Sequence, residues 1–502
     1  MSTGWINQIG NWNPQFLREC RGHLKPRSVI ATLGTSLLLQ VLLILFQASF
    51  NVDVVGVAVN IFQLITWTLP YFLFIVGGYY LVNDLAQEEK RGTLNFIRLS
   101  PRPARDILLG KLLGVPILPY LILLSVIPLH IWSTLQAQIP LGFLLSYYSL
   151  LGATAFLCFS VALLVGLTQQ LRPKQTPAAI AFAALGLFLF APGFMLWNTT
   201  VIWHRFQGIA QAVSFDSDPF SVFWLYLNLT DNSFFGHGFV LINLGVITYC
   251  VWRTLIRLFY QPRATLLSKR LSYGITAYVN VLIWGFFQSN APDRPEAAAA
   301  FFILYFVNYG LILALIATLT PNRQQLFDWL SHGRSDVTSQ LWNNKSPAMT
   351  ALGVNILIAC GLVVPWSVVV GLENLPLAYL LLMPLSVALS WLTYGAIAQL
   401  IFITRVRTPA MWMASTLALV IFVPLIILFL FQKGSPPAVL WMFYRTVLGY
   451  PFYEYPQVGF LRAVVLGVMA QGALLLALLA LLNQRFNKLR QSVGSRTARQ
   501  QN

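Results

Sequence analysis

Long apolar runs, separated by short polar segments, dominate the pattern of this chain. An α-helix needs about 20 mostly apolar residues to cross the roughly 30 Å of hydrocarbon in a membrane. Runs of this kind lie at residues 28–50, 57–83, 112–133, 143–168, 177–197, 238–260, 272–289, 299–319, 349–371, 376–403, 410–432 and 458–483. The pattern therefore predicts an all-α, polytopic integral membrane protein with about 12 transmembrane helices.

The composition also indicates that membrane hydrocarbon, rather than water, surrounds most of the protein surface. Of all residues, 57% are hydrophobic and 9% are charged, whereas soluble domains carry about 25% charged residues. The net charge of +17 would suit nucleic acid, but Lys and Arg fall in short clusters between apolar runs, so we expect no nucleic-acid partner. The four cysteines form no C-x-x-C pair, which argues against a disulfide framework or a zinc site.

The positive charges are divided unequally between the two sides of the predicted membrane. Twenty-seven of the 32 Lys and Arg fall in the N-terminal segment, the tail, every second loop and the span ends that adjoin these loops. The opposite side holds the other five: Arg205, Arg294, Lys433, Arg445 and Arg462. Because positively charged loops stay inside the cell, both termini are predicted to be cytoplasmic, in a chain that crosses the cytoplasmic (plasma) membrane many times. Membrane lipids with anionic headgroups are expected partners of these charges.

The loops repeat a pattern that divides the chain in two. In each block of six predicted spans, the longest inner loop follows the second span, at 84–111 and at 320–348. The outer loop after the fifth span carries P-x-x-V-x-W in both blocks, ending at Trp224 and Trp441. These matches favour two parallel six-helix repeats, with chance similarity as the alternative. The predicted organisation is an N-terminal segment at 1–27, repeats at 28–260 and 261–483, and a basic, disordered tail at 484–502.

A short amphipathic helix is predicted before the first span. Asn13-Pro14 is a helix-start signal, a capping side chain followed by Pro at the first helical position. One face of this helix is apolar: Phe16, Leu17, Cys20 and Leu24. The other face is polar: Arg18, Glu19, Arg21 and His23. Such a helix is expected to lie along the membrane surface as an elbow, and a solvated arm is the alternative.

The loop at 84–111 carries the most informative pattern in the chain. Gly92 can stop the helix that descends from the second span, and Thr93 can cap a new short helix. Three residues give the new helix an apolar side: Leu94, Ile97 and Leu99. Ser100-Pro101 then ends it. The prediction is a compact helix joined to two spans, which suits transmission of movement from a cytoplasmic partner. An ordinary surface loop is the alternative.

With these residues in place, the first half of the chain resembles the permeases of ATP-binding-cassette (ABC) type-2 exporters. The usual signature of that family after its second span is an acidic cluster, Gly-Thr-Leu, Ser/Thr-Pro, Ile and Gly-Lys. The matching residues are Glu88-Glu89, Gly92-Thr93-Leu94, Ser100-Pro101, Ile107 and Gly110-Lys111. The second half is similar in layout, and its inner loop has an amphipathic stretch at 321–330 without Gly-Thr-Leu.

The resemblance implies the membrane subunit of an exporter for an unidentified substrate that is lipophilic, lipid-linked or amphipathic. A separate ABC ATPase subunit would use the ATP, and this chain would bind no cofactor or metal and catalyse no reaction. The residues implied in coupling to the ATPase are Glu88, Glu89, Arg91, Gly92, Thr93, Leu94, Ile97, Phe327 and Trp329. The chain contains no G-x-x-x-x-G-K-[ST] phosphate loop, as expected if the ATPase is another chain.

Two other classes of protein stay open. A membrane glycosyl or lipid transferase would use acidic residues of an outer loop, for which Asp216 and Asp218 are the candidates. An ion-coupled secondary carrier usually has an ionisable group at mid-membrane. The predicted spans offer neutral polar side chains there: Asn60, Gln63, Asn280, Asn308, Asn355 and Gln399. Hydrogen bonds between helices are their expected role.

Overall fold

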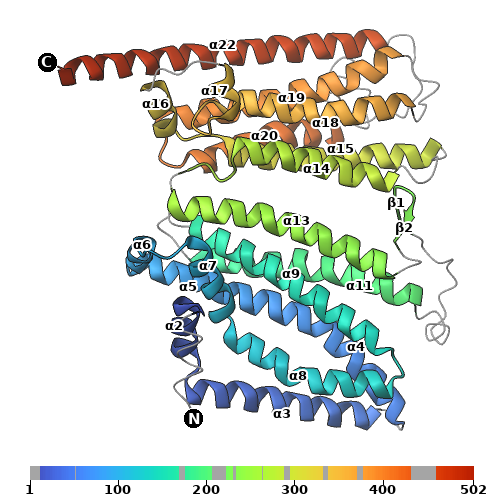
Figure 1. Ribbon diagram of the computed structural model, residues 1–502. Coiled ribbons are helices and arrows are strands. Elements are labelled where there is room, and N and C mark those ends of the chain that lie inside the picture. Colours follow the sequence, from blue (N-terminus) through green and yellow to red (C-terminus); the bar gives the residue numbers. More distant parts are fainter. Residues whose placement is uncertain are drawn as a thin grey trace. The chain divides into compact units, whose positions relative to one another are not determined.

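The computed structural model describes residues 12–50, 53–168, 176–205, 222–229, 233–262, 264–287, 294–331, 337–369, 377–430 and 460–501 (Figure 1). Within these ranges the chain is almost entirely helical, and two short strands, β1 (Phe223–Trp224) and β2 (Leu227–Asn228), pair with one another. The chain divides into two compact units. Unit 1 comprises Met1–Val222 and Asn228–Ala264, and unit 2 comprises Phe223–Leu227 and Thr265–Asn502.

Unit 1 is a bundle of long apolar helices with three short helices at one end. Its α-helices are α2 (Pro14–His23), α3 (Pro26–Phe50), α4 (Val54–Phe72), α5 (Gly78–Lys90), α6 (Thr93–Arg98), α7 (Ala104–Gly114), α8 (Ile117–Gln136), α9 (Leu141–Thr168), α10 (Thr176–Leu185), α11 (Ala191–Arg205) and α13 (Ser233–Tyr260). Two π-helical turns, η1 (Leu73–Gly77) and η3 (Gly186–Phe190), join α4 to α5 and α10 to α11. Val54–Lys90 is therefore one continuous helix of 37 residues.

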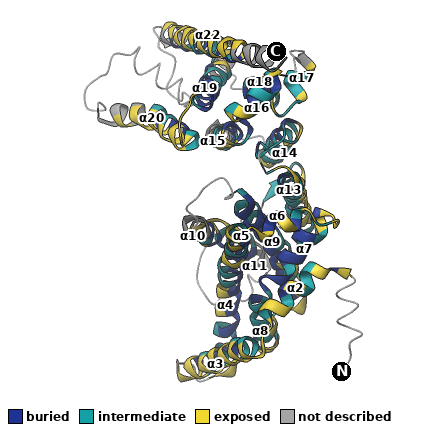
Figure 2. Ribbon diagram, turned by 90° about the vertical axis from the view of Figure 1, so that its left-hand side faces the viewer, coloured by how far each residue is buried: buried dark blue, intermediate teal, exposed yellow. Residues whose placement is uncertain are grey.

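The core of unit 1 lies around α9, which packs against α5 and α13. Phe74, Tyr147 and Phe159 are fully buried there, whereas most apolar side chains of α3 are exposed (Figure 2). An apolar face of this size is suited to hydrocarbon rather than water. Pro70 removes one backbone donor from α4, which leaves the carbonyl oxygen of Thr66 without its helical partner. The Tyr147 hydroxyl supplies a replacement hydrogen bond of 3.0 Å to that oxygen.

Unit 2 is a second helical bundle. Its helices are α14 (Lys269–Phe287), α15 (Arg294–Leu319), α16 (Arg323–Ser331), α17 (Val337–Trp342), α18 (Ala348–Val369), α19 (Leu377–Ile403), α20 (Pro409–Leu430) and α22 (Phe460–Gln501). Helix α18 packs against α14, α15 and α19, and α22 packs along α19. Stacked rings of Tyr305 and Trp391, with centroids 6.1 Å apart, lie between α15 and α19.

Buried amides of unit 2 pair with polar groups on neighbouring helices. Asn280 of α14 and Asn308 of α15 exchange hydrogen bonds of 2.9 and 2.8 Å. Asn355 of α18 accepts a 2.6 Å hydrogen bond from the Thr276 hydroxyl and donates one of 3.1 Å to Ser272 Oγ. These contacts confirm that the three asparagines join helices, the role expected of polar groups in a membrane interior.

Eight of the described helices are long and apolar enough to cross a membrane. They coincide with the first four predicted spans and with those at 238–260, 349–371, 376–403 and 458–483. Helices α15 and α16 form a further candidate, bent by 64° at its break. The prediction of an all-α, polytopic membrane protein is therefore confirmed, whereas the count of about 12 spans and the two parallel repeats stay predictions.

The expectation for the tail was wrong, whereas a break in the third span is expected from its prolines, Pro116, Pro119 and Pro128. The tail, predicted to be disordered, instead continues α22 to Gln501, and the buried contacts of Leu482 and Leu489 beside α16 stabilise this extension. The third predicted span is interrupted between α7 and α8 at Pro116, because proline lacks the N–H group that a continuous helix would use.

Asp216, Asp218 and the motif ending at Trp441 lie outside the described residues.

Candidate functional site

The N-terminal helix α2 packs directly on α7. Asn13 caps α2 by accepting a 3.0 Å hydrogen bond from the Phe16 backbone N–H, as its sequence position predicts. The same side chain donates a 2.7 Å hydrogen bond to the Asp106 carbonyl oxygen of α7. Gly110 and Gly114, one helical turn apart on α7, permit this contact, since a Cβ on either glycine would overlap atoms of α2.

The close approach buries a group of charged side chains between α2, α5 and α7. Lys111 of α7 is 1% exposed. Its ammonium lies 2.6 Å from Asp84 Oδ2, 2.8 Å from Glu88 Oε2 and 3.3 Å from Glu19 Oε1. Arg18 of α2 forms further ion pairs with Glu19, at 2.8 Å, and with Glu88. These five residues, here called the Lys111 cluster, connect three helices through charge.

The charges in the Lys111 cluster stabilise one another. Burial alone would lower the pKa of Lys111, but the negative charges of Asp84, Glu19 and Glu88 outweigh it and raise that pKa. Burial alone would raise the pKa of Glu19, but Lys111 and Arg18 outweigh it and lower that pKa. Both groups are therefore charged at neutral pH. Glu19, which the sequence places on the polar face of α2, is buried, because Lys111 gives its carboxylate a partner.

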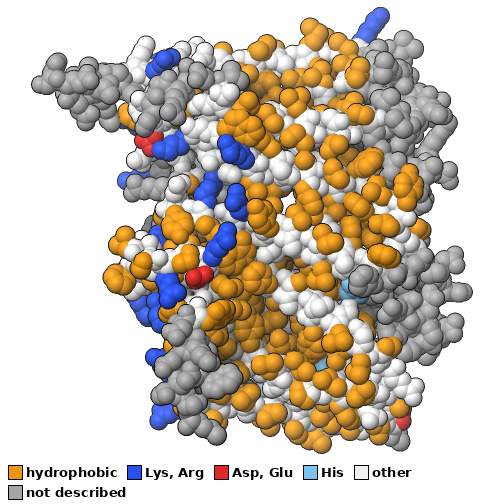
Figure 3. Space-filling model, in the orientation of Figure 1, with side chains coloured by type: hydrophobic (Ala, Val, Ile, Leu, Met, Phe, Trp, Pro, Cys, Tyr) orange, Lys and Arg blue, Asp and Glu red, His pale blue; other side chains and the backbone are white. Residues whose placement is uncertain are grey.

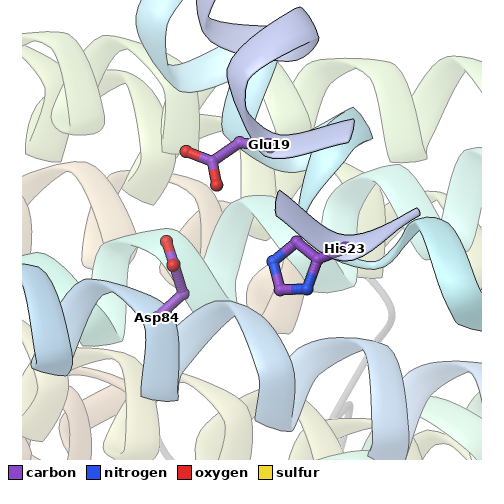
Figure 4. Close-up of side chains that lie close together, drawn as sticks. All are labelled: Glu19, His23 and Asp84. Atoms are coloured by element: carbon purple, nitrogen blue, oxygen red, sulfur yellow. The ribbon is translucent and has the colours of Figure 1, made fainter. Parts of the chain in front are cut away.

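Glu19, His23 and Asp84 also lie close enough to hold a metal ion, with their ligand atoms within 4.8 Å of one another (Figure 4). Figure 4 shows the two carboxylates turned toward each other, with His23 on the same helix as Glu19. The Lys111 ammonium already forms ion pairs with both carboxylates and would repel a divalent cation placed there. The arrangement therefore favours an ion-pair connection over a metal centre.

A glycine in the left-handed conformation turns the chain from α5 into α6. Gly92 has φ +72°, a conformation that costs residues with a Cβ about 1–2 kcal/mol. The backbone N–H groups of Arg91 and Gly92 close the end of α5 by hydrogen bonds to carbonyl oxygens of that helix. Gly92 thus stops the helix as predicted. Thr93 is the first residue of α6 rather than its cap, and its hydroxyl donates a 3.1 Å hydrogen bond to the Glu88 carbonyl oxygen.

Helix α6 has one face inside unit 1 and another at its surface. Leu94 and Ile97 are buried in the core together with Phe259 of α13. Phe96 and Leu99 are 79% and 84% exposed. In Figure 3, apolar side chains at the α6 end of unit 1 lie beside Lys and Arg side chains. An exposed apolar pair on a helix that is otherwise well packed is suited to contact with a partner.

The other predicted coupling residues of unit 1 divide between surface and interior. Arg91, Gly92 and Thr93 are exposed, and Glu89 is half-buried. Glu88 is buried within the Lys111 cluster. The structure therefore brings these residues together around one helix end, but it places Glu88 where it holds unit 1 together rather than at the surface.

In unit 2, the predicted coupling residues lie on α16. Phe327 is half-buried, and Trp329 is buried with its indole N–H 3.5 Å from Ser339 Oγ of α17. Leu326 of the same helix packs against α22. The inner loop of unit 2 thus forms a helix as predicted, and contact of these residues with an ATPase stays a prediction.

The end of α13 also holds the segment between α6 and α7. The Arg98 guanidinium lies over the Phe259 ring, 5.7 Å from its centroid. The Tyr260 hydroxyl accepts a 3.0 Å hydrogen bond from the Ala104 backbone N–H at the start of α7. That N–H is one of the donors that a helix start leaves unpaired. Helix α6 is therefore fixed by α5, α7 and α13 together.

Three features of the site were missed at the level of sequence. Gly110 and Gly114 have the small-xxx-small spacing typical of closely packed helices, which was a readable signal. The exposure of Phe96 follows from its place two residues after Leu94, about 200° around the helix. No local pattern pairs Tyr260 with Ala104, because 156 residues separate them.

Fold and site together define an all-α, multi-pass membrane protein in which a short helix, α6, is clamped at one end of unit 1. No family model, no curated protein and no solved structure matches the chain. Membership of a family is therefore a proposal that rests on the residues described above.

Proposed function

We propose that the chain is the membrane-spanning permease subunit of an ABC exporter. In this proposal a separate nucleotide-binding subunit hydrolyses ATP, and the permease uses its movement to translocate a lipophilic, lipid-linked or amphipathic substrate. The observation that carries the proposal is α6, a short helix with exposed apolar side chains that is fixed by buried contacts to membrane-crossing helices. The ATPase binds on the side that holds most of the Lys and Arg, which is the cytoplasmic side.

The surface of α6 defines the chemistry of the partner. Phe96 and Leu99 offer the apolar contact, and fully burying two such side chains contributes about 3–6 kcal/mol. Lys90, Arg91 and Arg102, which flank α6 in the sequence, are also exposed. The matching surface of the ATPase is therefore an apolar slot with acidic residues at its rim.

The buried predicted residues act from inside unit 1. Leu94 and Ile97 hold α6 on the core, and Glu88 joins α5 to α2 and α7 through the Lys111 cluster. A displacement of α6 by the partner therefore moves α2, α5 and α7 as one body. Because α5 continues into α4, the displacement reaches a membrane-crossing helix directly.

The test is recovery of an ATPase with the full chain, purified from its native membrane in mild detergent. We expect an ATPase subunit to co-purify with the unaltered chain. The amount that co-purifies with the Phe96→Ser/Leu99→Ser variant should be lower by about 10-fold or more. Tyr226→Ser is the matched control, because Tyr226 is an 83% exposed aromatic residue far from α6 in the sequence, and it should retain the partner. The proposal fails if no ATPase accompanies the unaltered chain, or if the double variant binds it fully.

Neither alternative class has a comparable observation in its favour. A secondary carrier could use neutral oxygens for an ion, but Asn280, Asn308 and Asn355 are engaged in hydrogen bonds between helices. The candidate acids of a transferase, Asp216 and Asp218, lie outside the described residues. Transport that survives ATP depletion but stops with an ionophore would revive the carrier.

A further inference from the structure

Lys269, the first residue of α14, is buried among oxygen atoms of unit 2. Its side chain is 1% exposed. The ammonium lies 2.6 Å from the Gln340 carbonyl oxygen, 2.6 Å from Ser346 Oγ and 2.9 Å from the Pro347 carbonyl oxygen, and Thr350 Oγ1 is 3.5 Å away. These four oxygens are here called the oxygen cage. Among the residues that the structure describes, no carboxylate forms an ion pair with Lys269.

The hydrogen bonds of the oxygen cage require a nitrogen with three hydrogens. Carbonyl oxygens only accept, so Gln340 and Pro347 each take one N–H. The Ser346 hydroxyl donates its own hydrogen to backbone oxygens of residues 340 and 343, at 2.9 and 2.8 Å, and therefore accepts from Lys269. Only an ammonium supplies three donors at once. Burial lowers the pKa of Lys269 to about 7, so the charged form that fits the oxygen cage predominates below that pH.

The oxygen cage closes the end of α17. This helix has six residues, and its last carbonyl groups have no partner within the helix. Lys269 satisfies the carbonyl oxygen of Gln340, and the Tyr273 hydroxyl donates a 2.8 Å hydrogen bond to that of Leu341. A positive charge at a helix C-terminus is also favoured by the helix dipole. The Gln340 oxygen also accepts hydrogen bonds from the Ser346 and Thr350 hydroxyls, so Lys269 and Tyr273 of α14 join residues of the following segment in closing the last turn of α17.

The segment that follows α17 is held by the same residue. The Lys269 backbone N–H donates a 2.9 Å hydrogen bond to Asn344 Oδ1, and the next residue, Arg270, lies over the Trp342 ring at 5.3 Å. Ser339 of α17 in turn contacts the Trp329 indole of α16. One buried lysine thus stands at the centre of the contacts that order residues 337–350.

We propose that the oxygen cage is a binding site for a primary ammonium group, which the chain fills with its own Lys269, and that residues 337–350 are assembled on this cation. The site differs in kind from the Lys111 cluster, where carboxylates surround the lysine. It is independent of the proposed function, since it requires neither an ATPase nor transport.

The experiment measures amide hydrogen exchange of residues 337–350 in the full chain at pH 6.5. Lys269→Ala removes three methylene groups and the ammonium, which n-propylammonium replaces atom for atom. We expect exchange in this segment to rise about 10-fold or more in Lys269→Ala and to return toward the unaltered value when millimolar n-propylammonium is added. Lys269→Met keeps an unbranched apolar side chain but has no ammonium, so exchange should rise and n-propylammonium should not restore it.

Two controls separate charge from packing. Lys345→Met removes an exposed lysine of the same segment and should leave exchange unchanged. The uncharged probe n-propanol should not restore Lys269→Ala. Unaltered exchange in Lys269→Met, or equal rescue by n-propanol, would show that the ammonium is merely tolerated and would overturn the proposal. If Lys269→Ala does not fold, Lys269→Met alone decides the outcome through the same measurement.

Discussion

The buried charge of Lys111 offers the sharpest test of how α2, α5 and α7 are held together. Lys111→Met keeps the length and apolar stem of the side chain but removes the ammonium that lies within 3.3 Å of three carboxylates. Removing one partner of a buried ion pair costs about 3–5 kcal/mol, because the other partners stay buried without compensation. Arg18 still pairs with Glu19 and Glu88 in this variant, so Asp84 is the carboxylate that is most affected by the loss of the ammonium.

The free energy of unfolding in detergent, from denaturant titration followed by tryptophan fluorescence, measures this loss. Lys345→Met is the matched control, because Lys345 pairs with Asp328 at 3.5 Å while their side chains are 54% and 45% exposed. An exposed pair of this kind contributes about 0–1 kcal/mol. Adding Asp84→Asn to Lys111→Met should recover at least about 1 kcal/mol, since it removes the orphaned charge.

The reasoning is refuted if Lys111→Met and Lys345→Met cost the same. It is also refuted if Asp84→Asn adds its own full cost on top of Lys111→Met, because additivity would mean that the two groups do not interact. Either result would leave the packing of Gly110 and Gly114 as the main source of the contact between α2 and α7.

Three further predictions follow from the same structure. Gly92→Ala should cost about 1–2 kcal/mol of unfolding free energy through its positive φ alone, which calorimetry or denaturant titration checks against an alanine at an exposed helical glycine. Asn280→Leu should cost about 0.6–2 kcal/mol, and the additional change Asn308→Leu should recover most of it, because the pair of amides then leaves no unpaired partner. The lowered pKa of Glu19 means that its contribution is present above about pH 4.3 and is lost as the pH falls further. The raised pKa of Lys111 means that its contribution is present below about pH 10.4 and is lost above it. Protection of α2 amides from hydrogen exchange should therefore fall at both extremes of pH.

Much of the fold was readable because the membrane imposes strict rules on sequence. Apolar runs of fixed length and the unequal distribution of Lys and Arg predict helices that span a bilayer, and the helical membrane fold is confirmed. The stop at Gly92 was equally readable, since few residues other than glycine take a positive φ.

The assignment of polar residues to faces was less predictable. The hydrophobic periodicity of α2 groups Glu19 with the other polar residues of the helix. It distinguishes apolar from polar positions but does not show whether a polar side chain has a buried partner. That partner, Lys111, lies 92 residues away in the sequence, so no local pattern links the two residues. Similarly, Leu99 was grouped with Leu94 and Ile97, although the structure buries those two and exposes Leu99.

The helix Val54–Lys90 runs without a break through 37 residues, about 55 Å at the usual rise per residue, although hydrocarbon accounts for only about 30 Å of that length. When a rigid helix tilts about one end, the displacement of each residue grows with its distance from that end. A tilt of about 10° around its Asp53 end would carry Gly92 sideways by about 10 Å, many times the displacement of residues near that end. In the proposed exporter, a small tilt of this helix within the bilayer would therefore be accompanied by a much larger displacement of α6 outside it.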